Sequence, residues 1–266
     1  MHHLVVIPLV PDTGDEIADD TARELLADAL WAAGAVGVED LGPNVRGAFT
    51  DPETARATAA RLGGTVEPVA DDTGLDAWRD HATSHRAGPF LVRPPWIDAV
   101  PETLDLVIDP RHAFGSGSHP STRLALDLLA GVVGPDDHVL DVGTGSGILA
   151  IAAARLGARV VALDTDPNAE AAVRANAEAN AVADRVDHRR GDGAAATGDF
   201  TLGLCNMTID LHEAIGPSLA AGASIGRLIV AGILAGEQER RAAAAHGRAK
   251  IVDRRVDGDW VALLLA

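Results

Sequence analysis

The chain has 266 residues, enough for one large α/β domain or two smaller ones, and its 47% hydrophobic content is typical of a globular protein. Its 39 acidic and 22 basic residues give a net charge of −17, which argues against a general nucleic-acid binder, because phosphate contacts need a basic face. The single cysteine, Cys205, excludes an internal disulfide and suits a reducing compartment such as the cytoplasm, and no apolar run predicts a membrane span.

The first 70 residues read as strand, helix, strand, strand, helix, strand. The four expected strands lie near residues 4–9, 35–41, 45–50 and 65–70. We expect the first helix over about 15–33. The second should begin at Asp51 and Pro52, a capping acid followed by a first-turn proline, and end at Gly63. This order predicts a ferredoxin-like domain over residues 1–70, in which nothing looks catalytic.

Residues 71–103 are predicted to connect this domain to a second one. A short helix is expected over 74–87, with Trp78 on its apolar face. Four prolines then break regular structure, namely Pro89, Pro94, Pro95 and Pro101. The second domain is predicted to span 104–266 and to open with an apolar strand near 104–108.

A loop of small and hydroxyl-bearing residues covers 114–123, Phe-Gly-Ser-Gly-Ser-His-Pro-Ser-Thr-Arg, and leads into a helix predicted over 122–129. Helix N-termini present free N–H groups and positive potential, which suit a carboxylate. His119 is tempting as a base, but a histidine between serine and proline in a loop is more often a hydrogen-bonded scaffold residue. We expect that role for it.

The most informative stretch is 139–147, Val-Leu-Asp-Val-Gly-Thr-Gly-Ser-Gly, followed by an alanine-rich helix predicted over 148–156. An apolar strand, a glycine turn and a helix bring a backbone close to a nucleotide-like ligand, because glycine tolerates positive φ and has no Cβ to block the approach. Dinucleotide sites usually read G-x-G-x-x-G, whereas this loop reads D-x-G-x-G-x-G from Asp141. That variant suits a ligand without a pyrophosphate, and S-adenosylmethionine is the obvious candidate.

The next strand is expected over 159–163, and Asp164 follows it directly. Asp164 comes about 20 residues after Gly143, which is the sequence spacing that suits a ribose-binding acid. An acid there can accept two hydrogen bonds from ribose hydroxyls; a strand-end or capping acid is the alternative. Thr165 or Asp166 is expected to cap the helix that follows, with Pro167 in its first turn.

The remaining units alternate strand and helix and end in a hairpin. The expected strands lie at 185–189, 200–205, 227–233, 250–256 and 260–265, and helices at about 207–219 and 237–245. Asp257-Gly258 between the last two strands is a strong hairpin signal. A parallel sheet finished by an antiparallel hairpin predicts an α/β fold with the seven-stranded, Rossmann-like sheet of class I methyltransferases.

Two more polar residues follow strands of this sheet. Asp192 comes after the third strand, where it could meet an adenine amino group, and Asn206 ends the fourth. The carboxyl ends of strands in such sheets point into the ligand crevice.

We expect Cys205 and Trp260 to be core residues, and Asp210 and His212 to lie on a solvated helix face.

Residues 114–122, 139–152 and 163–167, with shorter matches at 74–78, 232–234 and 258–261, resemble the PrmA family of bacterial ribosomal-protein methyltransferases. The resemblance implies an N-terminal ferredoxin-like domain that recognises the substrate. It also implies S-adenosylmethionine-dependent N-methylation, on lysine or N-terminal amines, of a protein at the base of the large-subunit stalk. The negative charge of the chain would favour encounter with such a basic partner.

The predicted S-adenosylmethionine contacts are Phe114, Thr122, Asp141, Gly143, Gly145, Asp164, Asp192 and Asn206. Asn206 is also the predicted catalytic residue, which orients the acceptor amine. The family usually has Asn-Leu-Tyr or Asn-Ile-Leu where this chain has Asn206-Met207-Thr208, so the identity of the acceptor is the open point. No metal is predicted, because no HExxH motif or Cys/His ligand spacing occurs.

Three alternatives stay open at this point. The first is an N-methyltransferase that acts on another protein or on a small molecule. The second is a non-catalytic scaffold that binds S-adenosylmethionine. The third is an NAD-dependent oxidoreductase, which the glycine spacing and the terminal hairpin disfavour.

Overall fold

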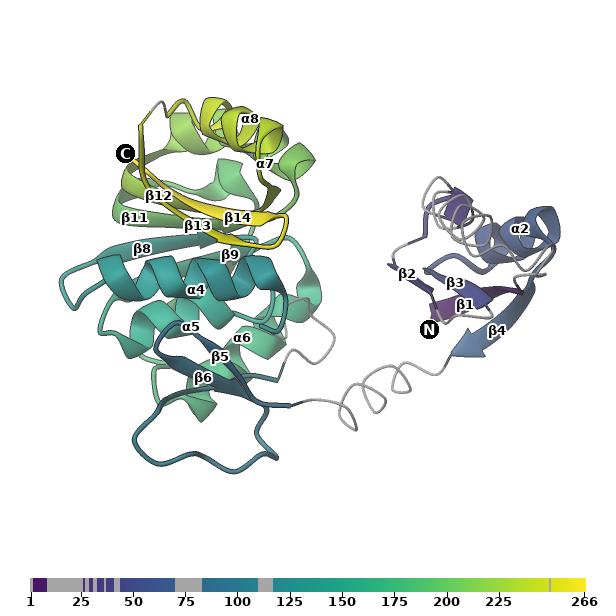
Figure 1. Ribbon diagram of the computed structural model, residues 1–266, viewed down its shortest axis with the longest axis horizontal. Helices are drawn as coiled ribbons and strands as arrows, with labels where there is room; N and C mark the ends of the chain where they lie inside the picture. The colour runs from purple at the N-terminus through teal and green to yellow at the C-terminus, as the bar shows by residue number, and fades with distance from the viewer. Residues whose placement is uncertain are drawn as a thin grey trace. The chain divides into compact units, whose positions relative to one another are not determined.

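The computed structural model describes residues 2–8, 26, 29–30, 33–35, 37–40, 44–69, 83–109, 117–248 and 250–266. The chain divides into two compact units, Met1–His81 and Ala82–Ala266. Within the described residues the first unit has one hydrophobic core and one β-sheet, and the second unit has two cores and two β-sheets (Figure 1). No helix in the described part of the chain is long and apolar enough to cross a membrane.

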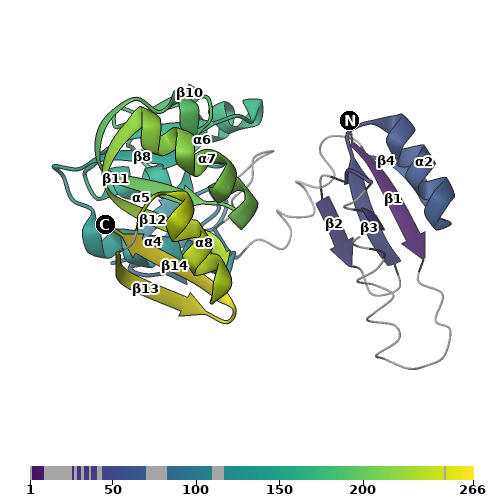
Figure 2. The same cartoon turned by 90° about the horizontal axis from the view of Figure 1, so that it is seen from above.

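The first unit holds an antiparallel four-stranded sheet in the order β2-β3-β1-β4. Its strands are β1 (His2–Pro8), β2 (Gly37–Asp40), β3 (Asn44–Phe49) and β4 (Thr65–Val69). Helix α2 (Pro52–Leu62) packs against β1 and β4 (Figure 2). The first helix, expected over 15–33, lies largely outside the described residues, so the ferredoxin-like assignment stays a prediction.

Local signals set both ends of α2. The Asp51 side chain accepts a hydrogen bond from the Thr54 backbone N–H at 2.7 Å, which caps the free end of the helix. Gly63 ends it in the left-handed conformation, at φ 73°. The expected capping acid, first-turn proline and terminal glycine are therefore confirmed.

The second unit is built on a seven-stranded sheet in the order β10-β9-β8-β11-β12-β14-β13. Its strands are β8 (His138–Val142), β9 (Arg159–Asp164), β10 (Val186–Arg190), β11 (Gly198–Asn206), β12 (Ala223–Leu234), β13 (Ile251–Asp257) and β14 (Trp260–Leu265). Strands β8 to β12 pair in parallel, whereas β14 runs antiparallel to both its neighbours. The α/β class and the terminal antiparallel hairpin are confirmed, with the turn at Gly258 and Asp259, one residue later than expected.

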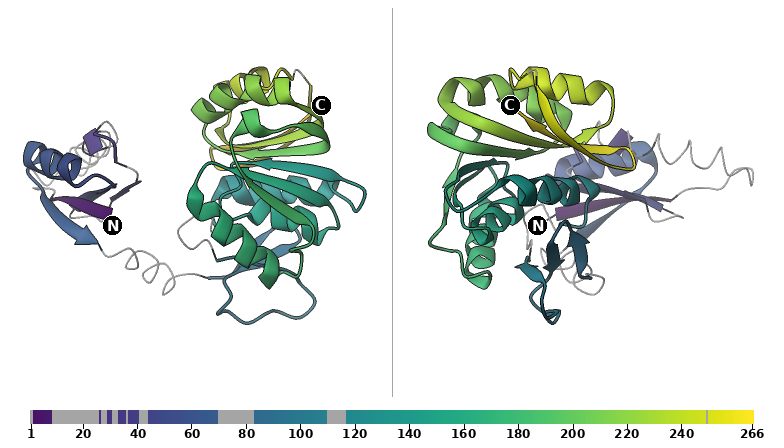
Figure 3. Two further views of the ribbon diagram at one scale, coloured as in Figure 1. Left: turned by 180° about the vertical axis from the view of Figure 1, so that it is seen from behind. Right: turned by 60° about the vertical axis from the view of Figure 1, so that its left-hand side comes forward.

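Helices cover both faces of this sheet (Figures 1 and 3). Helices α4 (Pro120–Val132), α5 (Ile148–Arg155) and α6 (Pro167–Ala179) lie on one face, and α7 (Ile209–Gly222) and α8 (Glu237–Ala245) on the other. Since successive side chains of a strand point to opposite faces, a central strand of this sheet contributes side chains to two cores. In β9, Val160 and Ala162 join the core under α4 to α6, while Val161 and Leu163 join the core under α7 and α8.

A small three-stranded sheet replaces part of the irregular connector expected over 71–103. Its strands β5 (His85–Ala87) and β6 (Phe90–Arg93) lie in that connector, whereas β7 (Leu104–Val107) is the strand that was expected near 104–108. The helix expected over 74–87 is wrong at its end, because 85–87 are strand; Trp78 lies outside the described residues. The four prolines that predicted irregular structure here lie between the strands. They therefore do not interrupt the strands, and Phe90 and Leu106 enter the core beneath α4.

Candidate functional site

The site lies where the parallel strands β9, β8 and β11 end. In the sheet register Val142 is paired with both Leu163 and Cys205, so the residues that follow these three lie side by side at one edge. Those residues are Gly143, Asp164 and Asn206. The carboxyl ends of parallel strands form the usual ligand crevice of open α/β sheets.

The glycine loop after β8 has a backbone that only glycine adopts readily. Gly143, Gly145 and Gly147 have φ angles of 74°, 56° and 84°. The loop folds over the end of β9, because the backbone N–H groups of Gly143 and Thr144 both donate to the Leu163 carbonyl, at 2.9 and 3.0 Å. A Cβ on Gly143 would also lie 3.1 Å from Met207 Cε, so this position is closely packed as well.

The Asp164 carboxylate joins the glycine loop to the start of α6. Its Oδ2 accepts the Gly145 backbone N–H at 2.7 Å, and its Oδ1 accepts the Asp166 backbone N–H at 2.9 Å. A carboxylate has about four acceptor positions in total. Each oxygen of this half-buried side chain therefore keeps one further position, which matches the two hydroxyls of a ribose. The donor and acceptor set fits the nucleoside part of S-adenosylmethionine.

Asp141 lies beneath the same loop and is 1% exposed. Its carboxylate accepts the Thr144 hydroxyl at 2.6 Å. Burial raises the pKa of Asp141 to about 7; the Thr144 hydrogen bond opposes this shift and the nearby charge of Asp164 adds to it. The contacts that the structure gives Asp141 are with Thr144 of the loop and with the backbone of Ala150, so its contact with a cofactor stays a prediction.

Asn206 and Thr122 meet although they are 84 residues apart in the sequence. The Asn206 Nδ2 donates to Thr122 Oγ1 at 3.0 Å, which connects the end of β11 to the first turn of α4. Thr122 is 2% exposed. Because the hydrogen bond fixes the amide nitrogen toward Thr122, the Asn206 Oδ1 is left as an acceptor.

His119 precedes α4 and is the hydrogen-bonded scaffold residue that was expected. Its Nδ1 caps the helix by accepting the Ser121 backbone N–H at 3.2 Å, and its ring packs edge-on against Trp260 at a centroid distance of 4.4 Å. Burial lowers the pKa of His119, and the charge of Arg123 lowers it further. The imidazole is therefore held neutral as a cap and packing group.

Asp192 lies at the same edge of the sheet, beyond β10. Its neighbour Gly191 donates its backbone N–H to the Asp164 carbonyl at 2.9 Å. The exposed Asp192 side chain accepts the Ala194 backbone N–H at 2.9 Å and thereby caps the short 3-10 helix Gly193–Ala195. Phe114, the remaining predicted contact, lies outside the described residues.

The expectation that His212 lies on a solvated face is wrong, because its side chain is 0% exposed. Its Nε2 donates to the Ala231 carbonyl at 2.9 Å, so its Nδ1 must accept the N–H of His246 Nε2, at 3.0 Å. Burial lowers the pKa of both imidazoles. The buried residues of α7 recur at helical spacing, as Ile209, His212, Gly216 and Leu219, and this period is the signal that would have found it.

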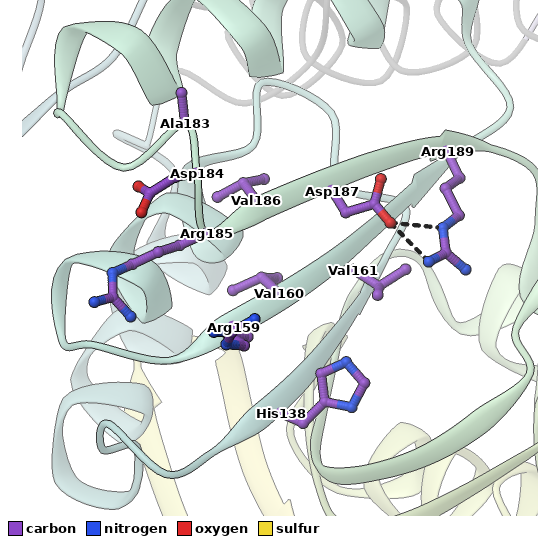
Figure 4. Close-up of a pocket in the computed structure, with 10 residues that line it drawn as sticks. All are labelled: His138, Arg159, Val160, Val161, Ala183, Asp184, Arg185, Val186, Asp187 and Arg189. Atoms are coloured by element: carbon purple, nitrogen blue, oxygen red, sulfur yellow. Dashed lines mark hydrogen bonds and ion pairs between the residues drawn. The ribbon is translucent and has the colours of Figure 1, made fainter.

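A groove of about 400 Å³ lies elsewhere in the second unit (Figure 4). It begins at the amino ends of β8, β9 and β10, at His138, Arg159 and Val186. Figure 4 shows Arg189 turned to its ion-pair partner Asp187 on the same strand. The groove contains none of the predicted site residues, and strand direction places its opening away from the glycine loop. It is therefore not the candidate site.

Comparison with known proteins assigns a family to this arrangement. A family model described as Ribosomal protein L11 methyltransferase (PrmA) matches residues 44–266. The chain is 38% identical over 205 residues to the ribosomal protein L11 methyltransferase of Thermus thermophilus, covering 75% of this chain and 80% of that protein. It is also 38% identical over 253 residues to the enzyme of that name from Geobacter sulfurreducens, covering 86% and 83%.

A solved structure gives the same result. The chain is similar to the crystal structure of ribosomal protein L11 methylase from Lactobacillus delbrueckii subsp. bulgaricus, with a TM-score of 0.62 and 28% sequence identity. The match covers 69% of this chain and 97% of that one.

Proposed function

Because the chain belongs to the ribosomal protein L11 methyltransferase (PrmA) family, and is thus an S-adenosylmethionine-dependent methyltransferase, we propose that it methylates amine nitrogens of ribosomal protein L11. The observation that carries the proposal is the pairing of Asp164 with the glycine loop. The Asp164 carboxylate accepts the Gly145 N–H and keeps acceptor positions for a ribose, beside glycines that let a ligand approach the main chain closely. We propose lysine and N-terminal amines at the base of the large-subunit stalk as the acceptors.

The proposed cofactor contacts divide by the part of S-adenosylmethionine that each would hold. Asp164 accepts the ribose hydroxyls, Gly143 and Gly145 allow close approach of the main chain, and Asp192 receives the adenine amino group. The Thr122 hydroxyl, at the amino end of α4, can donate to the carboxylate of the methionine part, whereas the N–H groups of this helix end are already bonded to His119. Phe114, Asp141 and Asn206 complete the proposed set.

Bound S-adenosylmethionine supplies an activated methyl group: the amine lone pair forms the new N–C bond while the electron pair of the breaking C–S bond stays on sulfur. The chain therefore has to align the nucleophile with the methyl group rather than activate the methyl group. The proton that the product amine releases passes to solvent.

The acceptor amine must be neutral to react, and a free lysine, with a pKa of about 10.4, is mostly protonated at neutral pH. Burial beside a cationic sulfonium lowers that pKa through desolvation and like charge. No general base in the chain is then required. We propose that Asn206 Oδ1 accepts an N–H of the amine and so directs its lone pair, while Thr122 holds the Asn206 amide in place.

The direct test is incubation of the purified protein with S-adenosylmethionine and isolated L11, followed by mass spectrometry of L11. Mass increments of one or more methyl groups on lysine or N-terminal peptides are expected. Unmodified L11, with S-adenosylmethionine still bound by the protein, would contradict the proposed substrate. It would favour another acceptor or a non-catalytic scaffold, and the Met207-Thr208 departure is the reason to look for one.

Asn206→Ala tests the proposed catalytic residue. We expect kcat to fall about 10- to 100-fold, because misplacement of reacting groups costs this much. Asn168→Ala is the control, since Asn168 is exposed in the first turn of α6 and is not a proposed contact. If Asn206→Ala keeps both turnover and cofactor affinity at the wild-type level, the proposed role is wrong.

The charge of the chain supports the choice of partner. A net charge of −17 would speed encounter with a basic ribosomal protein, and no nucleic-acid contact is proposed. We propose that the enzyme works in the cytoplasm, where the buried thiol of Cys205 stays reduced.

A further inference from the structure

One side chain of α6, Asn176, joins two main-chain segments that are far apart in the sequence. Its Nδ2 donates to the carbonyls of Asp109 and Ser146, both at 2.9 Å, and its Oδ1 accepts the Asp109 N–H at 2.9 Å. Asp109 follows β7, and Ser146 is in the glycine loop. The Asn176 side chain is 1% exposed, and it uses both amide hydrogens and its oxygen inside the protein.

Asn180 makes the same kind of contact one helical turn later. Its Oδ1 accepts the Val107 N–H at 2.9 Å, and its Nδ2 donates to the Val107 carbonyl at 2.7 Å. Its remaining bond differs, because it goes to the Asn176 carbonyl within the same helix, also at 2.7 Å. Both asparagines therefore hold the chain around the end of β7, but only the side chain of Asn176 reaches the glycine loop.

The bond to Ser146 completes a set of contacts that fix the loop. Leu163 O holds the N–H groups of Gly143 and Thr144, Asp164 holds that of Gly145, and Asn176 holds the carbonyl of Ser146. Ser146 is 0% exposed, so removal of the Asn176 side chain takes a hydrogen bond from a buried carbonyl. Glycines have the largest backbone freedom to lose, so this loop depends on such contacts to keep one shape.

We propose that Asn176 is a positioning residue for S-adenosylmethionine: through Ser146 it holds the glycine loop in the shape that receives the cofactor. The inference rests on the proposed function. Asn176 is buried behind the loop and needs no contact with the cofactor. Its loss should therefore weaken cofactor binding, because binding must then reorder the loop, and it should leave the affinity for the protein substrate unchanged.

The experiment compares Asn176→Ala with Asn180→Ala in the full chain. Calorimetry gives the Kd for S-adenosylmethionine, thermal melting without cofactor gives stability, and initial rates give KM for each substrate. We expect both variants to lose stability to a similar degree. Only Asn176→Ala should raise the Kd, and the KM for S-adenosylmethionine with it, by about tenfold or more, while the Kd of Asn180→Ala stays within about threefold of wild type.

Equal Kd changes in the two variants, or no change in Asn176→Ala, would overturn the inference. Asn176→Ser, whose hydroxyl can donate one hydrogen bond, serves if the alanine variant does not fold. It should give a Kd above that of the wild type, and a wild-type Kd would again overturn the inference. A wild-type chain that binds no S-adenosylmethionine would instead overturn the proposed function, so the two failures are distinct.

Discussion

At the scale of single residues, the Asp164 carboxylate accepts two backbone N–H groups and is also the proposed acceptor of the ribose hydroxyls. Asp164→Asn removes the charge and leaves one acceptor oxygen where two backbone N–H groups and a ribose need four positions. Hydrogen bonds to charged groups contribute about 1.5–3 kcal/mol, so we expect the Kd for S-adenosylmethionine to rise about 10- to 100-fold. Calorimetry with purified variant and wild type measures this.

The control for this substitution is Asp166→Ala, two residues away. The Asp166 side chain caps α6 by accepting the Asn168 backbone N–H at 2.8 Å. Loss of the cap should cost about 1 kcal/mol of stability, visible as a lower melting temperature, while cofactor affinity stays near that of the wild type. Wild-type affinity in Asp164→Asn would show that the ribose assignment is wrong.

Asp141 gives the protein a pH-dependent stability of a defined sign. Its pKa is raised from 3.8 to about 7 by burial, so the folded state binds this proton more tightly than the unfolded chain does. The stability that this supplies is fully present below pH 3.8 and is lost as the pH rises through about 7.

Asp141→Asn keeps an acceptor oxygen for the Thr144 hydroxyl but cannot ionise. The melting temperature of Asp141→Asn minus that of the wild type should therefore be larger at about pH 8 than at about pH 5. The expected change is several degrees, since about 1 kcal/mol corresponds to about 2–4 °C in a chain of this size. Thermal melts of both proteins at the two pH values provide the measurement. A difference between them that does not vary with pH would contradict the expected ionisation.

At the scale of elements, the contact between α7 and α8 depends on a glycine. A Cβ on Gly216 would overlap the Ala245 carbonyl oxygen and lie 2.7 Å from its carbonyl carbon. The two helix backbones thus touch, and Ala245 precedes His246, the partner of the buried His212. Gly216→Ala should therefore destabilise the fold by about 1–3 kcal/mol, through overpacking against rigid backbone.

Gly131 in α4 offers the matched substitution. It is an exposed residue near the helix end, and nothing lies within 4 Å of a Cβ built on it. Gly131→Ala should stabilise the protein by about 0.5–1 kcal/mol, because alanine loses less backbone entropy in a helix. Urea unfolding of both variants tests the opposite signs. A Gly216→Ala protein as stable as Gly131→Ala would disprove the close packing of α7 on α8.

At the scale of the whole molecule, the described site residues all belong to the second unit. Residues 82–266 contain both of its cores, and the first unit has a separate core. We expect a chain of residues 82–266 to fold and to bind S-adenosylmethionine within about threefold of the full chain. If the first unit recognises the substrate, kcat/KM for L11 should fall at least about tenfold in the truncated chain.

The readouts for the truncated chain are calorimetry for the cofactor and initial rates for L11 methylation. Circular dichroism establishes first that the truncated chain is folded. Unchanged kcat/KM for L11 would exclude substrate recognition by the first unit. Loss of cofactor binding by a folded second unit would contradict the placement of the whole cofactor site there.

Features that depend on neighbours in the sequence were predictable from the sequence alone. The caps at Asp51 and Asp166 act on N–H groups two or three residues away, and the glycines of the loop allow its positive φ angles. Strand periodicity and the terminal turn follow from residues in direct succession. These signals are local, so they determined the α/β class, the terminal hairpin and the position of the loop after β8.

Only the tertiary structure decided which distant residues meet. Asn206 finds Thr122 across 84 positions, and Asn176 finds Asp109 across 67. No local pattern encodes such pairs, because a side-chain amide bonds whatever polar group the packing of strands and helices brings within reach. The strand at 85–87 is not such a case, because it pairs with β6 across a two-residue turn. The bond of His212 to His246 is one, since it joins residues 34 positions apart when α7 and α8 pack together.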